Sequence, residues 1–257
     1  MGESTGRQKA LITGASSGIG EAFAYWYARH GYDLVLVARN RSELERVAVA
    51  SKALGAESKI VVADLSSSVG VESVVGMCTE IQTLVVNAGI THAATIGTTN
   101  RDELDSLTYL LATGVVRLCE AVVPAMIQRG GGDVVIVSSI AAFTPMRKAA
   151  PYAAAKSHSA AYARSLSLEV RSKKVRVVAV CPGYVRTDLH RRAGLDHLNQ
   201  SVPRWMWLST DDVVKATAQA LRRGKVVVVP GAVYKLALPF LTSAAAQTVW
   251  KKLTRRN

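Results

Sequence analysis

The sequence predicts an α/β fold, with one doubly wound parallel sheet in a single domain. Short apolar runs alternate with longer segments along most of the chain. The runs are rich in Val and Ile and mostly lack alternating polar residues, as is typical of parallel strands that are buried on both faces. The longer segments carry apolar residues at helical spacing. Ligands of such sheets bind beyond the carboxyl ends of the strands, so polar residues that follow strands are the candidates for function.

The apolar runs predict seven strands, at 9–13, 33–38, 59–63, 83–87, 133–138, 175–181 and 225–229. The longer segments predict helices at 19–30, 41–54, 69–80, 103–129, 151–172 and 210–223. No linker rich in Pro, Gly or Ser divides the chain, so residues 1–257 are expected to form one domain. Within it, we expect a lid at about 184–210 and an apolar and basic C-terminal segment at about 231–257.

A glycine-rich turn follows the first expected strand. Its sequence is Thr13-Gly14-Ala15-Ser16-Ser17-Gly18-Ile19-Gly20. Glycine is needed where the backbone approaches a pyrophosphate and where a helix packs closely on a strand, and free amides at the helix start hold the phosphates. A plain tight turn is the alternative. The position between a strand and a helix favours a Rossmann-type dinucleotide site.

Arg39 stands at the end of the second expected strand, where a site that prefers NAD usually places a carboxylate. No acidic residue is present there. A guanidinium group matches the geometry of a 2′-phosphate, so Arg39 favours NADP(H) as the cofactor. The alternative is a solvated surface arginine.

The glycine pattern, Asp64-Leu65 after the third strand and Asn87-Ala88-Gly89 after the fourth resemble the short-chain dehydrogenase/reductase family. The resemblance extends from about residue 9 to residue 230. It implies that Asp64 contacts the adenine and that the Asn-Ala-Gly turn lines the cofactor cleft. Asp64 could instead be a helix N-cap. Asn87 could instead brace the sheet, a role that is compatible with the functional one.

Tyr152 and Lys156 lie four residues apart in an expected helix and therefore share a face. Hydride transfer to a carbonyl leaves charge on its oxygen, which then needs a proton. A tyrosine can supply that proton if a nearby ammonium lowers its pKa from the ordinary value near 10. Ser139 follows a strand at the same edge of the sheet and can orient the substrate oxygen.

In the family that this chain resembles, Ser139, Tyr152 and Lys156 match the catalytic serine, tyrosine and lysine, and the lysine also holds the nicotinamide ribose. Ser138 competes for the serine role, but the family's motif places the catalytic hydroxyl last in the pair. The resemblance also assigns a turn after the sixth strand to the nicotinamide. Its residues are Pro182, Gly183, Val185 and Thr187.

One position departs from the family's pattern. Leu111 stands where the family often has an asparagine that supports a water-linked proton relay. Leucine cannot perform this side-chain role, so either a backbone carbonyl holds the water or the relay is rearranged. This departure is the one observation that favours a second hypothesis, a catalytically weak, cofactor-binding regulatory protein.

The formal net charge of +13 favours acidic partners such as phosphorylated cofactors. The basic residues are scattered without interleaved aromatic residues, so we expect no nucleic-acid partner. Cys78, Cys119 and Cys181 lie far apart, which argues against disulfides and metal sites and favours buried thiols in a reducing cytosol. The polar N-terminus lacks the core of a signal peptide, so a cytoplasmic location is expected.

The substrate is expected to be a hydrophobic small molecule with a carbonyl or alcohol group. The expected lid carries the apolar cluster Trp205-Met206-Trp207-Leu208, and also Arg186, Arg191 and Arg192, which suit acidic handles. The segment from Trp205 to Gly231 resembles the branch of 3-oxoacyl and mycolate-type reductases, and the family implies a homodimer or homotetramer. Residues 236–250 are apolar and precede a basic tail, which predicts either peripheral membrane contact or packing on a neighbouring subunit.

Overall fold

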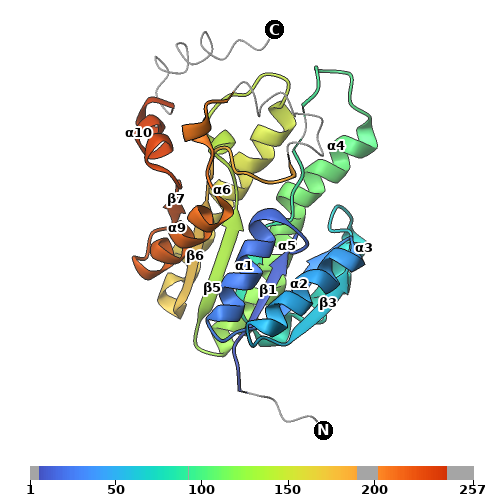
Figure 1. Ribbon diagram of the computed structural model, residues 1–257. Coiled ribbons are helices and arrows are strands. Elements are labelled where there is room, and N and C mark those ends of the chain that lie inside the picture. The colour runs from blue at the N-terminus through green and yellow to red at the C-terminus, as the bar shows by residue number, and fades with distance from the viewer. Residues whose placement is uncertain (1–5, 92, 190–201, 242–257) are drawn as a thin grey trace.

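The computed structural model describes residues 6–91, 93–189 and 202–241 (Figure 1). Within these residues, seven parallel strands form one sheet in the order β3-β2-β1-β4-β5-β6-β7. The strands are β1 Lys9–Thr13, β2 Asp33–Ala38, β3 Ser58–Val62, β4 Ile81–Val86, β5 Gly132–Val137, β6 Val175–Val180 and β7 Val227–Val228. The expected fold class, a Rossmann-type doubly wound sheet, is confirmed.

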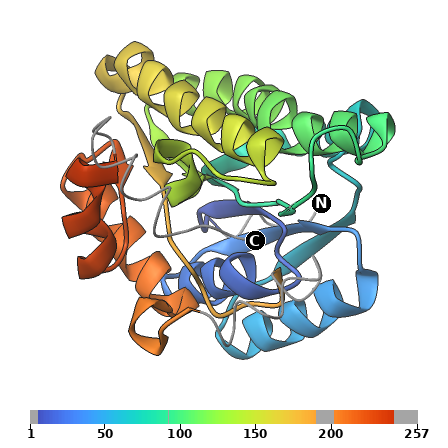
Figure 2. The same ribbon diagram turned by 90° about the horizontal axis from the view of Figure 1, so that it is seen from above.

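Helices cover both faces of the sheet. One face carries α1 Gly18–Arg29, α2 Arg41–Ala53 and α9 Thr210–Arg222, and the other carries α3 Ser68–Val75, α4 Arg101–Thr108, α5 Gly114–Gln128 and α6 Ala150–Val170. Figure 2 shows these two layers with the sheet between them. The chain order reverses between β1 and β4, and such a switch point is where doubly wound sheets bind their ligands. Helix α10, Ala232–Leu241, lies beyond the carboxyl ends of the strands (Figure 1).

The strands are buried because they lie between these two layers. Every residue of β5 is buried, and so are the last four of β1. In the described part of the chain, the stretch Arg101–Gln128 is long and apolar enough to span a membrane by length and composition. Its apolar side chains Val115, Leu118, Val122 and Met126 belong to the main core, which explains the composition.

The helix expected at 103–129 is interrupted. Between α4 and α5 lies a π-helical turn, Tyr109–Thr113, in which the amide of Gly114 donates to the carbonyl of Tyr109 five residues earlier. Such turns insert one extra residue and occur frequently at functional sites. Here the turn contains Leu111, the position at which the sequence departs from the family.

The remaining differences from the expected elements are small. Most strand and helix ends lie within two residues of the expected positions. The helix expected at 69–80 ends earlier, at Val75, because Gly76 follows, and a 3-10 turn then spans Cys78–Glu80. The strand expected at 225–229 is only Val227–Val228. The C-terminal part of the apolar segment, 242–257, lies outside the described residues. All three cysteines are buried and free, as expected.

Candidate active site

A cavity of 380 Å³ lies at the carboxyl edge of the sheet, above the switch point. Most of the residues that were predicted from the sequence line this cavity. Its wall includes Gly14, Ser16, Ser17, Gly18, Ile19, Asn87, Gly89, Ser139, Tyr152, Lys156, Pro182, Gly183, Val185 and Thr187. Five other predicted residues do not form its wall: Gly20, Arg39, Asp64, Leu65 and Ala88. The cavity therefore brings the glycine-rich turn together with the predicted reacting groups.

The glycine-rich turn is shaped for a close ligand. Gly14 and Gly18 both have positive φ angles, 64° and 60°, which glycine adopts without strain. Ser17 is the N-cap of α1, yet its side chain makes no capping hydrogen bond, so the first amides of the helix keep their donors for another group. A pyrophosphate is the ligand that uncapped amides at the positive end of a helix hold best, and the turn fits a dinucleotide on this ground.

Gly20 allows α1 to pack tightly on the turn. A Cβ atom there would lie 2.2 Å from the carbonyl oxygen of Gly14 and 2.6 Å from the side-chain nitrogen Nδ2 of Asn87. We expect Gly20→Ala to lower the free energy of unfolding by about 2 kcal/mol and to weaken NADPH binding at least about tenfold, because the backbone of the turn must move. Urea unfolding and fluorescence titration measure the two effects. Gly76→Ala is the matched control, since nothing lies within 4 Å of its added Cβ. Equal behaviour of the two variants would contradict the packing argument.

Asn87 braces the switch point. Its side-chain amide donates to the carbonyl oxygens of Thr13 at 3.0 Å and of Gly14 at 3.3 Å. The hydroxyl of Thr13 in turn accepts from the backbone amides of Asn87 and Ala88, at 2.8 and 2.9 Å, and donates to the carbonyl of Val85. Asn87 thus has the bracing role that the sequence left open, and it also lines the cavity.

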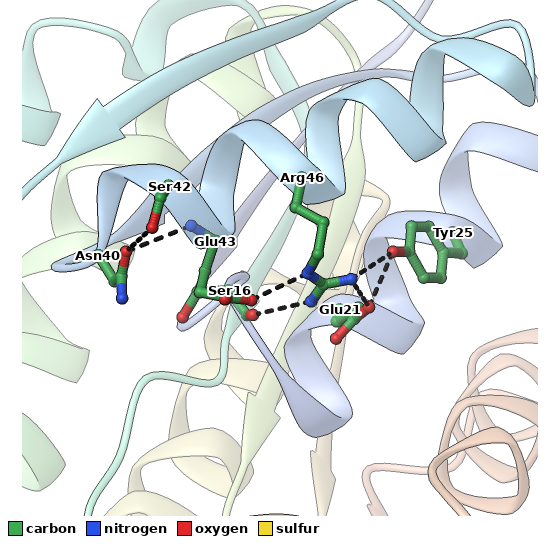
Figure 3. Close-up of polar contacts among 7 residues, drawn as sticks. All are labelled: Ser16, Glu21, Tyr25, Asn40, Ser42, Glu43 and Arg46. Carbon is green, nitrogen blue, oxygen red and sulfur yellow. Dashed lines mark hydrogen bonds and ion pairs between the residues drawn. The ribbon is translucent and has the colours of Figure 1, made fainter.

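Arg46 supports the glycine-rich turn from outside the cavity and was not predicted from the sequence. From α2 it donates to the carbonyl oxygen of Ser16 in the glycine-rich turn, and it pairs with Glu21 at 2.8 Å and Glu43 at 2.9 Å (Figure 3). Burial raises the pKa of Glu21, but hydrogen bonds from Arg46 and Tyr25 outweigh this and bring the pKa below its usual range. This network of ionised side chains connects α2 to α1 and to the glycine-rich turn.

Arg39 and Asp64 follow β2 and β3, which are neighbours in the sheet. Burial raises the pKa of Asp64, but hydrogen bonds from the amide and hydroxyl of Ser66, together with the charge of Arg39, lower it overall. The N-cap of α3 is Ser67, which accepts from Gly70, so the alternative assignment of Asp64 as that cap was wrong. Arg39 is exposed at this rim, and Leu65 is buried in the core.

The two candidate serines have different surroundings. Ser138 is buried, and its hydroxyl donates to the carbonyl oxygen of Lys156 at 2.7 Å, a contact that fixes α6 on β5. Ser139 accepts from the amide of Ala141 at 3.2 Å and lies within hydrogen-bonding reach of Tyr152. The geometry therefore gives Ser138 a structural partner and places Ser139 beside the tyrosine.

Lys156 is buried in the cavity wall and Tyr152 is partly buried there, and desolvation is the largest influence on both pKa values. It raises the pKa of Tyr152, an effect that the hydrogen bond from Ser139 only partly offsets. It lowers the pKa of Lys156 to about 8, although nearby Cys181 acts in the opposite direction. The net shift of the tyrosine pKa is upward in this structure, so the expected lowered pKa was wrong. The lysine donates to the carbonyl of Val137 at 2.9 Å, and its Nζ lies 5.9 Å from the centre of the tyrosine ring.

Leu111 is buried beside the predicted reacting groups. It packs in a small apolar cluster with Leu107 and Ala155, against which Tyr152 also packs. Its carbonyl oxygen accepts from the hydroxyl of Ser159 at 2.7 Å. Ser159 lies one turn beyond Lys156 on the same face of α6, a spacing that could have drawn attention to it in the sequence. The carbonyl that could hold a relay water thus already has one partner.

The remaining wall of the cavity is largely apolar. It includes Ile90, Ile140, Met146, Met206 and Ala237, with Arg147 at the exposed rim. These residues come from four separate loops or helices, including the expected lid and α10. The arrangement offers an apolar compartment next to the hydroxyl groups of Ser139 and Tyr152.

Lid residues 190–201, including the predicted Arg191 and Arg192, lie outside the described part of the chain. The described part of the expected lid packs around Trp207. The centre of the Trp207 ring lies 5.4 Å from the centre of the Tyr184 ring, and the guanidinium of Arg186 lies 5.9 Å from the centre of the Trp207 ring. This tryptophan thus packs the lid onto neighbouring residues, whereas Trp205 is 66% exposed.

The fold and the site together define a dinucleotide-dependent oxidoreductase, and comparison with known proteins gives the family. Residues 8–197 match the short chain dehydrogenase family. The chain therefore belongs to the short-chain dehydrogenase family.

Individual relatives agree with this membership. A 3-oxoacyl-[acyl-carrier-protein] reductase from Homo sapiens is 31% identical over 228 residues, which cover 86% of this chain and 95% of that one. A dehydrogenase/reductase SDR family protein 7-like from Drosophila melanogaster is 35% identical over 71% of this chain, but the match spans only 59% of the fly protein. The structure of a short-chain dehydrogenase from Sphingobium yanoikuyae in complex with NADPH superposes with a TM-score of 0.82. It is 30% identical and covers 97% of this chain and 98% of its own.

Proposed function

We propose that this protein is an NADP(H)-dependent oxidoreductase that interconverts a ketone and a secondary alcohol on a hydrophobic substrate. The observation that carries the proposal is the single cavity that joins the glycine-rich turn to Ser139, Tyr152 and Lys156 and continues into an apolar compartment. The NADPH complex of the Sphingobium relative and the acyl substrate named for the human relative support the cofactor and the substrate class.

In the proposed mechanism, the glycine-rich turn and the turn at 182–187 would hold NADP(H), which would supply or accept the hydride when bound. Ser139 donates a hydrogen bond to the substrate oxygen, and the phenol of Tyr152 gives up its proton to that oxygen during reduction. The raised pKa of Tyr152 keeps the phenol protonated before reaction. The ammonium of Lys156 stabilises the phenolate that forms, and the apolar wall excludes water from the reacting atoms.

A panel of carbonyl compounds with NADPH tests the activity. We expect loss of nicotinamide absorbance with 3-oxoacyl thioesters and other bulky apolar ketones, and little with polar ketoses, because the compartment has few polar partners to offer. The Tyr152→Phe variant, run beside the wild type, controls for other sources of oxidation. Faster turnover of polar ketoses than of apolar ketones would overturn the substrate class.

Cofactor preference tests the role of Arg39. We expect NADPH to bind at least about tenfold more tightly than NADH, a difference of about 1.4 kcal/mol that one charge-assisted contact can supply. Arg39→Ala should remove most of this preference by weakening NADPH binding and sparing NADH. Fluorescence titration with both cofactors measures it, with Arg29→Ala, on an exposed position of α1, as the control. An unchanged ratio in Arg39→Ala means that the arginine is only a solvated surface residue.

The regulatory alternative rests on Leu111, whose side chain offers no polar atom for a proton relay. It predicts NADPH binding of ordinary strength together with no turnover of any compound in the panel. Leu111→Asn separates the two functions. A gain of activity in this variant from an inactive wild type favours the regulator, whereas an active wild type excludes it.

Assembly and membrane contact are further parts of the proposal. Leu168 on α6 is 80% exposed and Leu236 on α10 is 74% exposed, and apolar side chains on such helices suit packing between subunits. We propose that the subunits assemble as a homodimer or homotetramer, which would cover such exposed side chains. Peripheral membrane contact through residues 236–250 remains a prediction, and liposome co-sedimentation of the full chain tests it.

A further inference from the structure

Tyr234, in the first turn of α10, connects three segments that are distant in the sequence. It is buried, with 5% of its surface exposed. Its hydroxyl accepts a hydrogen bond from the amide of Tyr184 at 3.0 Å and donates one to the carbonyl of Met206 at 2.7 Å. Tyr184 follows β6, whereas Met206 ends a 3-10 turn, Arg204–Met206, on the far side of the lid. One hydroxyl thus links both sides of the lid to the C-terminal helix.

The ring of Tyr234 also lies directly against the turn that contains Gly183. A Cβ atom on Gly183 would lie 2.0 Å from Cζ of the tyrosine, so only glycine fits under the ring. On the other side of the turn, the carbonyl of Pro182 accepts from the amide of Ile140, at 2.9 Å, just after Ser139. The turn is therefore held between the tyrosine and the strand end that carries the reacting serine.

The two sides of the lid are also paired with each other. Val185 and Leu208 form a parallel bridge, with the amide of Leu208 donating to Tyr184 at 2.9 Å and that of Arg186 donating to Leu208 at 3.0 Å. This bridge and Tyr234 share the backbone of Tyr184, so α10, the 3-10 turn and the turn at Gly183 are joined by one set of hydrogen bonds.

We propose that Tyr234 is a positioning residue that couples the lid and α10 to the turn at 182–187 and so determines how tightly the nicotinamide end of the cofactor is held. The proposal rests on the proposed function, which assigns that turn to the nicotinamide. It makes the C-terminal helix part of the cofactor site although the helix lies on the substrate side of the cavity.

The experiment compares two nucleotides on the Tyr234→Phe variant, which keeps the ring and removes both hydrogen bonds. NADPH occupies both ends of the site, whereas adenosine 2′,5′-bisphosphate lacks the nicotinamide. We expect the Kd for NADPH to rise about tenfold, with an unchanged Kd for the bisphosphate. Tyr162→Phe is the matched control, since that half-buried tyrosine on α6 bonds Glu120 away from the cavity. Equal losses for both nucleotides, or no loss for either, would overturn the proposal.

A second measurement does not depend on cofactor binding. Hydrogen exchange without nucleotide should be faster in Tyr234→Phe than in the wild type at 183–186 and 206–208, and equal elsewhere. Unchanged exchange in these two segments would overturn the coupling, whatever the wild type binds. Conversely, a wild type that does not bind NADPH refutes the proposed function, while the exchange result still decides whether Tyr234 restrains the lid.

Discussion

Tyr152→Phe is expected to lower kcat by about three orders of magnitude and to leave the Kd for NADPH within about twofold of the wild type. Removal of a well-placed proton donor costs roughly 10²- to 10⁴-fold in rate. The phenylalanine ring keeps its contacts with the apolar cluster of Leu107, Leu111 and Ala155, so the shape of the cavity should persist. Steady-state turnover of a substrate from the carbonyl panel and fluorescence titration of NADPH measure the two quantities.

Tyr162→Phe is again the suitable control, because it removes a phenolic hydroxyl from the same helix outside the cavity. It should turn over at the wild-type rate. If Tyr152→Phe kept more than a few per cent of wild-type activity, another group would have to supply the proton, and the assignment of Tyr152 as the acid would be wrong.

Lys156→Met is expected to abolish turnover and, without added cofactor, to raise the free energy of unfolding at pH 7 by about 2 to 3 kcal/mol. Burial lowers the pKa of Lys156 from 10.5 to about 8. The folded protein therefore binds this proton less tightly than the unfolded chain does, and the buried ammonium costs about 1.4 kcal/mol for each pKa unit. Loss of the hydrogen bond to Val137 offsets roughly 1 kcal/mol of the gain.

The pH dependence checks the sign of this prediction. The cost is fully present below pH 8 and disappears as the pH rises towards 10.5, since the unfolded chain binds more protons only in that window. The stability advantage of Lys156→Met should therefore shrink between pH 8 and 10, as measured by urea unfolding. Lys173→Met, at an exposed position, should show no such trend. A methionine variant that is less stable than the wild type at pH 7 would show that burial of Lys156 is not destabilising.

The parts of the site that the sequence predicted are local. The glycine-rich turn occupies eight consecutive residues, and Tyr152 and Lys156 are one helical turn apart, so spacing alone places them together. The same strand order that buries β1 and β4 brings these local motifs to one edge of the sheet. The pattern of short strands and helices therefore predicted the edge at which the cavity lies, and the resemblance to the family supplied the choice of Ser139 and the turn at 182–187.

The parts that the sequence did not predict depend on contacts between distant segments. Arg46 reaches Ser16 from 30 residues away, and Tyr234 reaches Tyr184 from 50 residues away, with no spacing rule to reveal either contact. The direction of the Tyr152 pKa was wrong because it depends on burial, which a motif does not encode. The π-helical turn at Leu111 was missed because its apolar pattern is that of a continuous helix.

The hydroxyl of Thr13 has a consequence for the order of events in folding. It accepts from two amides that lie 74 and 75 residues further along the chain, and it donates back to the strand that precedes them. These bonds exist only after β1 has docked beside β4, a pairing with a large loop-closure cost. The floor of the cavity therefore needs two segments, 74 and 75 residues apart in the sequence, and neither segment can form it alone. Thr13→Val, which keeps the shape and removes the acceptor, would leave both amides without this partner where the two segments meet.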